Sequence, residues 1–234
     1  MKLLPLLLAL ALAPAAAEDN APQSVNVSNV RDPAFKSYRL MLRGFEAFEK
    51  HQGLAPKAAL RFKLLPGPEV QRSGLELRLA GDSTSIPVPL DDELSFSLPR
   101  DDAAAKDDAD LRTNRKRGAV RWSPDIRTPG LAPDTRRLGD IRLECLVFWT
   151  IGREDTNLLV RTMFSANSNP CDSANASWYD ETERPLASAQ LREGGRVLPL
   201  KLWKKKMGFQ APLRDKSWSD DAVIELRYLS STQP

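Results

Sequence analysis

Four short segments between residues 60 and 98 alternate apolar and polar side chains with a period of two. This period is typical of antiparallel strands with one buried face and one face in water. Turn residues at Pro66-Gly67-Pro68, Gly81-Asp82 and Asp91-Asp92 separate the segments. Pro87 and Pro89 cannot donate ladder hydrogen bonds, so we expect their strand at a sheet edge. The apolar positions are Leu60, Phe62, Leu64, Leu75, Leu77, Leu79, Ile86, Val88, Leu90, Leu94, Phe96 and Leu98.

A similar order of turn residues and short apolar segments returns about 112 residues later in the chain. In each copy a Gly turn leads to a strand with proline, then to Arg-Asp, and then to Asp-Asp-Ala before another apolar segment. A repeat of this length indicates a duplicated β module and not a solenoid, whose units are shorter. The alternative is coincidence among common turn residues. The matched segments are 86–90 with 198–202, 98–101 with 212–215, and 107–109 with 220–222.

One amphipathic helix is predicted before the strands. Asp32 can cap it, Pro33 suits its first turn, and Gly53 is placed to end it in a left-handed turn. Its apolar face must be buried, most simply against a sheet, and the alternative is the groove of a partner. That face consists of Phe35, Tyr38, Met41, Leu42, Phe45 and Phe48.

Ile141–Ile151 is the most apolar stretch after the leader, and we interpret it as a central strand buried on both sides, with 158–164 as its neighbour. Strands are also expected at 186–191, 197–203, 209–213 and 222–229. The predicted fold is mainly β, with two antiparallel sandwich-like modules and one helix packed on the first. The predicted boundaries are a flexible N-terminus at 18–31, a first module at 32–138 and a second at 139–234.

Residues 1–17 have the pattern of a secretory signal peptide. Lys2 supplies the positive start, an apolar run follows, and Ala15-Ala16-Ala17 offers a cleavage site after Ala17. The apolar run is too short to span a bilayer, which needs about 20 residues. We therefore expect a secreted or periplasmic chain without a membrane span. Removing Lys2 leaves a net charge of +2, which gives no argument for nucleic acid.

Cys145 and Cys171 are the only cysteines. An oxidising compartment favours a disulfide between them, the alternative being one buried and one exposed thiol.

The segment from Arg112 to Arg142 has a net charge of +6 and is rich in Pro and Gly, so we interpret it as a long loop. Guanidinium groups bind phosphate and carboxylate, and an aromatic ring adds a stacking surface. The alternative is that the arginines pair with the protein's own Asp residues. The candidate anion-binding residues are Arg115, Arg117, Arg121, Trp122, Arg136 and Arg137. Trp203-Lys204-Lys205-Lys206-Met207 forms a second cationic feature, interpreted as a solvated hairpin tip or a contact for an anionic membrane.

The sequence contains few residues suited to catalysis. His51 is the only histidine, so no multi-histidine metal site exists, and neither cysteine lies beside a cation that would activate it. Pairs of Asp or Glu could hydrolyse glycosides, but their separation is not readable from sequence. The acidic pairs lack the calcium-loop spacing. No catalytic residue, metal or cofactor is predicted.

Gly81-x-x-x-x-Ile86-Pro87, followed by Asp and by Phe96-Ser97-Leu98, resembles small prealbumin-like or carboxypeptidase-regulatory sandwiches. The resemblance covers about a fifth of the chain and implies a sandwich, with no site residue. We expect a non-catalytic binding or scaffold protein whose partner is an anionic envelope component or another secreted protein. The alternatives are an anion-binding envelope protein acting through Arg112–Arg142 and a carbohydrate-active enzyme using Asp or Glu.

Overall fold

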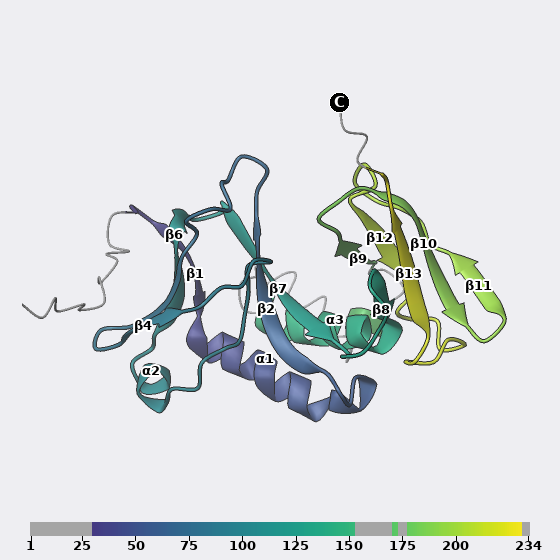
Figure 1. The fold of residues 1–234 in the computed structure, drawn as a ribbon. Coiled ribbons are helices and arrows are strands. Elements are labelled where there is room, and N and C mark those ends of the chain that lie inside the picture. Colours follow the sequence, from purple (N-terminus) through teal and green to yellow (C-terminus); the bar gives the residue numbers. More distant parts are fainter. Residues whose placement is uncertain (1–29, 153–169, 173–176, 231–234) are drawn as a thin grey trace, which may run out of the picture.

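The computed structural model describes residues 30–152, 170–172 and 177–230. The described chain is mainly β, with several antiparallel sheets and three α-helices. Figure 1 shows two groups of strands side by side, with α1 beneath the first group and α3 beneath the gap between them. No helix in these residues is long and apolar enough to cross a membrane. The leader predicted at 1–17 and the strand predicted at 158–164 lie outside the described residues.

The first half contains two antiparallel sheets, with strand orders β1-β6-β3-β4 and β5-β2-β7. Its elements are β1 (Pro33–Ser37), α1 (Tyr38–Lys50), η2 (Gln52–Leu54), β2 (Ala59–Pro66), β3 (Leu77–Ala80), β4 (Ser85–Val88), β5 (Ser95–Phe96), α2 (Asp102–Lys106), β6 (Asp110–Lys116) and β7 (Val120–Arg127).

The second half also contains two antiparallel sheets, with orders β11-β10-β13-β8 and β12-β9. Its elements are β8 (Thr135–Arg137), α3 (Leu138–Gly152), η3 (Pro170–Asp172), β9 (Trp178–Glu181), β10 (Leu186–Glu193), β11 (Arg196–Pro199), β12 (Gly208–Ala211) and β13 (Val223–Tyr228).

The period-two prediction is confirmed in the first half. Leu60, Phe62 and Leu64 of β2 are buried, while Arg61 and Lys63 between them lie on the polar face. The proline-bearing strand β4 lies at a sheet edge, as expected from its missing donors.

The helix prediction needs a correction at its N-terminus. Pro33–Ser37 forms β1 and pairs with β6, so α1 begins only at Tyr38. Pairing with β6 gives these residues ladder hydrogen bonds, and it leaves Phe35 on the outer face, 39% exposed. The predicted left-handed turn at Gly53 is also wrong, because Gly53 lies in the 3-10 turn η2 and its φ is not positive.

The predicted central strand at Ile141–Ile151 is wrong, because these residues belong to helix α3. Leu143 and Val147, together with Ile151, pack into the core of the first half. Ile141 and Cys145, together with Leu138, pack into the core of the second half. Burial on opposite sides hides the helical period, and the same residues fit a two-residue alternation equally well.

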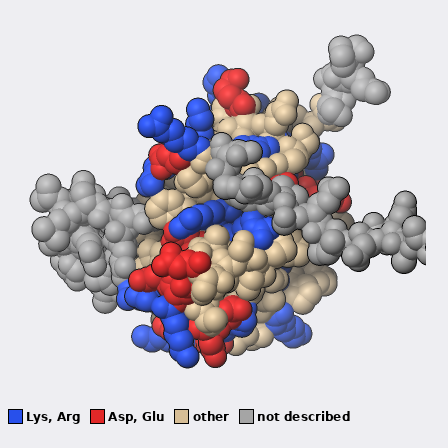
Figure 2. Space-filling view, turned by 90° about the vertical axis from the view of Figure 1, so that its left-hand side faces the viewer, with Lys and Arg blue, Asp and Glu red and all other residues tan. Residues whose placement is uncertain are grey.

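The predicted long loop from Arg112 to Arg142 is also wrong. The segment contains most of β6, all of β7 and β8, and the first turns of α3. Figure 2 shows that, on the face it presents, Lys and Arg side chains are interspersed with Asp and Glu.

The predicted disulfide is confirmed. Cys145 of α3 is bonded to Cys171 of η3, and both residues are buried. The bridge closes a separation of 26 residues, for which chain entropy alone gives about 3 to 4 kcal/mol of stabilisation. It fastens the chain after α3 to the core of the second half.

Candidate binding cleft

A cleft lies between the two halves. It consists of two adjoining hollows with volumes of about 690 and 600 Å³, which share Lys63, Arg136 and Asp180 among other residues. One wall is the polar face of β2 and β7, and the other is β9 with the hairpin tip at 203–207. Glu144 and Phe148 of α3 also line it, so the shared helix forms its floor. Its size is in the range of small-ligand sites.

Aromatic rings line both the walls and the floor of the cleft. Trp203 stacks on Tyr179, with ring centroids 4.8 Å apart and an interplanar angle of 25°. Trp178 lies edge-on to Phe148 across the floor, with centroids 5.4 Å apart. Trp122 contributes from β7 and is partly exposed. These rings offer flat apolar surfaces beside charged groups.

Ion pairs connect the two walls. Lys63 of β2 lies 2.8 Å from Glu183, and Arg72 lies 3.6 Å from the same carboxylate. Arg121 of β7 donates a hydrogen bond to Glu181 of β9. In these pairs the first half supplies the cations and the second half the carboxylates, and the charges of each pair largely neutralise one another.

A buried charge cluster lies at the base of the cleft. Arg136 of β8 donates to Glu144 at 2.8 Å and to Asp180 at 2.7 Å, and its side chain is only 4% exposed. The same Glu144 oxygen accepts a hydrogen bond from the backbone N–H of Ile126 at 2.7 Å. Glu144 thus joins α3 to β7 of the first half and to β8 of the second. The Nε of Arg136 has no acceptor in the described part of the chain.

The pKa values of Glu144 and its neighbour Asp125 are shifted in opposite directions. Burial raises the pKa of Glu144 to about 7, with Asp180 adding to the increase and Arg136 opposing it. Burial also acts to raise the pKa of Asp125, but Arg127 and Arg136 outweigh it and hold that pKa below its usual value. The Arg136 pKa is raised, because Asp180 and Glu144 outweigh the desolvation that would lower it.

Three of the six candidate anion-binding residues line the cleft, namely Arg121, Trp122 and Arg136. The other three lie elsewhere. Arg115 donates to the backbone carbonyls of Gln71 and Ser73, and Arg117 pairs with Asp32 at 3.0 Å.

Arg137 is tied to the protein's own groups. It lies 2.8 Å from Asp221 and 3.7 Å from Asp140, and it donates to the backbone carbonyl of Leu54. Arg142 is likewise occupied, donating to Asp220 at 2.6 Å and to the carbonyls of Leu213 and Asp215. The six residues therefore form no single surface.

Sequence reasoning missed several residues of the cleft, above all Glu144, Tyr179 and Asp180. Glu144 lies within the segment that the sequence predicts as a strand. The run Trp178-Tyr179-Asp180-Glu181 offered a signal, because aromatic residues beside carboxylates are typical of binding surfaces. His51 is exposed at the C-terminus of α1 and does not line the cleft.

Within residues 30–152, 170–172 and 177–230, no group of three or more His, Cys, Asp or Glu is placed to hold a metal ion. The chain matches no protein-family model, no curated protein and no solved structure. Its function is therefore inferred from the geometry of the cleft.

Proposed function

We propose that this chain is an exported, non-catalytic binding protein that holds a neutral oligosaccharide in the cleft above α3. The observation that carries the proposal is the combination of Trp122, Tyr179 and Trp203 with mutually paired charges on the two walls. The C–H faces of sugar rings pack on aromatic rings, and their hydroxyls both donate and accept hydrogen bonds. Paired guanidinium and carboxylate groups can serve both roles.

Charge balance favours a neutral ligand over a strongly anionic one. Arg121 pairs with Glu181 and Lys63 pairs with Glu183, so these cations offer no excess positive charge to bind an anion. An anionic ligand would have to displace internal carboxylates, whereas a hydroxyl-bearing ligand can bridge the existing pairs. This favours the cleft as a saccharide site over the anion-binding alternative for Arg112–Arg142.

The geometry of Glu144 supports binding without catalysis. Its raised pKa is a property expected of a general acid, but its side chain is only 4% exposed. One of its oxygens already accepts from Ile126 and Arg136. A general acid must reach the glycosidic oxygen of the substrate. We therefore assign Glu144 a structural role.

Two finer features belong to the same proposal. Export after cleavage at Ala17 agrees with the Cys145–Cys171 disulfide, since such bonds persist in oxidising compartments.

Duplication of a sandwich-like module is supported by strand order. β1-β6-β3-β4 has the connectivity of β8-β13-β10-β11, and β2-β5 that of β9-β12. A helix follows directly on β1 and on β8.

The test is a fluorescence titration of the five tryptophans with cellotetraose, maltotetraose and chitotetraose. We expect at least one tetrasaccharide to change the emission saturably. Trp203→Ala should weaken that binding by up to about tenfold, because a stacking partner contributes on the order of 1 kcal/mol. Trp218→Phe is the matched control, since Trp218 is buried outside the cleft. Absence of binding by all three sugars below millimolar concentration, or equal binding by the Trp203 variant, would contradict the proposal.

A further inference from the structure

The hairpin tip at the rim of the cleft has an unusual backbone. Lys204, Lys205 and Lys206 have φ values of 50°, 55° and 69°, three consecutive left-handed residues without a glycine. This conformation is strained for residues with a side chain, because the Cβ atom comes close to the following carbonyl oxygen. The turn is held by hydrogen bonds from Met207 N–H to the Lys204 carbonyl at 3.1 Å and from Trp203 N–H to the Gly208 carbonyl at 2.9 Å. The fold therefore maintains a strained conformation that gathers three lysines.

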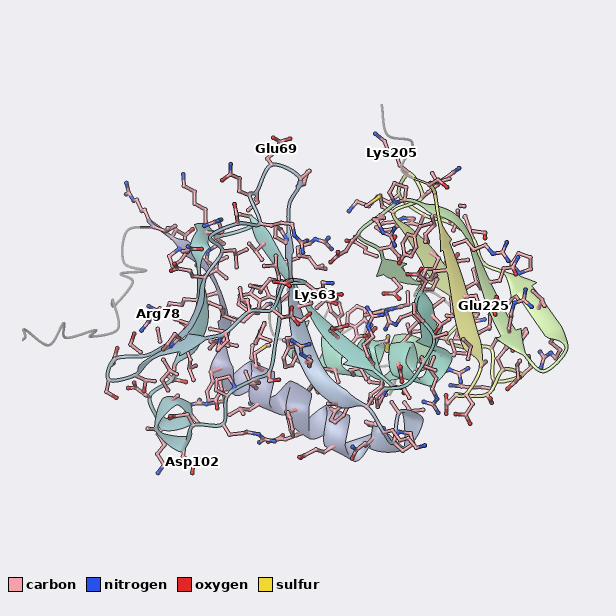
Figure 3. All side chains as sticks on the ribbon, in the orientation of Figure 1. Lys63, Glu69, Arg78, Asp102, Lys205 and Glu225 are labelled. Carbon is pink, nitrogen blue, oxygen red and sulfur yellow. A yellow bond between two sulfur atoms is a disulfide. The ribbon has the colours of Figure 1, made fainter. Side chains whose placement is uncertain are left out.

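The charges at this tip are only partly neutralised. Lys204 lies 3.2 Å from Glu181 and over the ring of Trp203. Lys205 and Lys206 are exposed and form no ion pair with any residue that the structure describes. Figure 3 shows Lys205 at the outer end of the tip, projecting away from the body of the molecule. These two ammonium groups are thus available to an external anion.

Amphipathic side chains flank the lysines. Trp203 and Met207 lie on either side of them in the chain, and both are partly exposed. Both also line the cleft. Tryptophan beside lysine suits the boundary between lipid headgroups and acyl chains, where the ring is partly buried and the charge stays in water.

We propose that the tip formed by Trp203–Met207 docks this protein on an anionic phospholipid surface, with Lys205 and Lys206 making the electrostatic contact. The strained turn holds both ammonium groups at one protruding point, and the partly exposed Trp203 and Met207 supply apolar contact. Docking at the rim brings the mouth of the cleft near the headgroups. The docking proposal rests on the residues of the tip alone, and it holds whether or not the cleft binds a saccharide.

The test is cosedimentation of the full chain with vesicles of pure phosphatidylcholine and of phosphatidylcholine containing 30% phosphatidylglycerol. We expect binding to the anionic vesicles only, lost at 0.5 M salt, because the Debye length shortens. Lys205→Asn/Lys206→Asn should weaken it about 25-fold, since each lysine near an anionic surface contributes about fivefold. Asparagine tolerates the left-handed conformation, so the turn should persist.

Lys57→Asn/Lys106→Asn is the matched control, because it removes the same charge from exposed sites away from the tip. It should bind like the unsubstituted chain. Failure of the unsubstituted chain to bind anionic vesicles would overturn the proposal, as would equal losses in the two double variants.

Discussion

At the scale of single residues, the charge cluster around Arg136 is the central feature. Arg136 and Glu144 are each only 4% exposed, so both lose hydration on folding. Such pairs are costly to bury and strongly destabilising to break one-sidedly. Their position between β7, β8 and α3 indicates that the pair fixes how the two halves meet.

Replacing Glu144 by Gln should change how stability depends on pH. The folded pKa of Glu144 is about 7, above its ordinary 4.5, so the folded state binds more protons than the unfolded state between these values. The free energy of unfolding of the native chain should therefore lose up to about 3 kcal/mol from this group as the pH rises from 4.5 to 7. Glu144→Gln should lack that loss.

Urea unfolding followed by tryptophan fluorescence between pH 4.5 and 8 measures this difference. Glu225→Gln, at a half-exposed ion pair with Arg192, is the matched control and should unfold in parallel with the native chain. A Glu144→Gln curve parallel to the native one would show that Glu144 does not titrate in this range.

Little of this residue-scale detail could be predicted from sequence. The arginine-rich segment suggested either an external anion or internal Asp partners, and internal pairs did form at Arg137 with Asp221 and at Arg117 with Asp32. Asp180 could not be identified as a partner of Arg136, because it lies 44 residues away in the chain. Only the tertiary fold brings them together.

Among the helices and strands, α3 connects the two halves of the molecule. It supplies side chains to both hydrophobic cores and forms the floor of the cleft. A helix buried on opposite sides has no polar face, so its period is not visible in the sequence. Segments with one wet face, such as β2 and β10, could be predicted because their alternation records which side faces water.

The crossing of α1 and α3 depends on Gly44. A Cβ atom at this position would lie 2.5 Å from the Cδ1 of Ile151. Gly44→Leu should therefore destabilise the chain by about 1 to 3 kcal/mol, because overpacking forces the two helices apart. Thermal unfolding followed by circular dichroism measures the effect. Gly53→Ala is the control, since its Cβ would meet nothing within 4 Å; equal melting temperatures for the two variants would contradict this packing.

At the scale of the whole molecule, two halves of matching strand order meet over one helix. The repeated order of turn residues in the sequence predicts two comparable modules, and this stays a prediction; the segments that begin at 86 and 198 lie in β4 and β11. The cleft itself could not be predicted. The cleft depends on how the two halves pack against α3, and the apolar pattern of residues 141–151 predicts a strand where the structure has this helix.

We propose that this cleft is the binding site of the protein. Hydrogen exchange monitored by mass spectrometry, with and without a saturating concentration of the tetrasaccharide that binds most tightly, tests it most directly. We expect slower exchange in β7, in β9 and at residues 202–208, with no change in the outer sheet β1-β6-β3-β4. Slower exchange confined to that outer sheet, or no slowing at β7 and β9, would contradict the account.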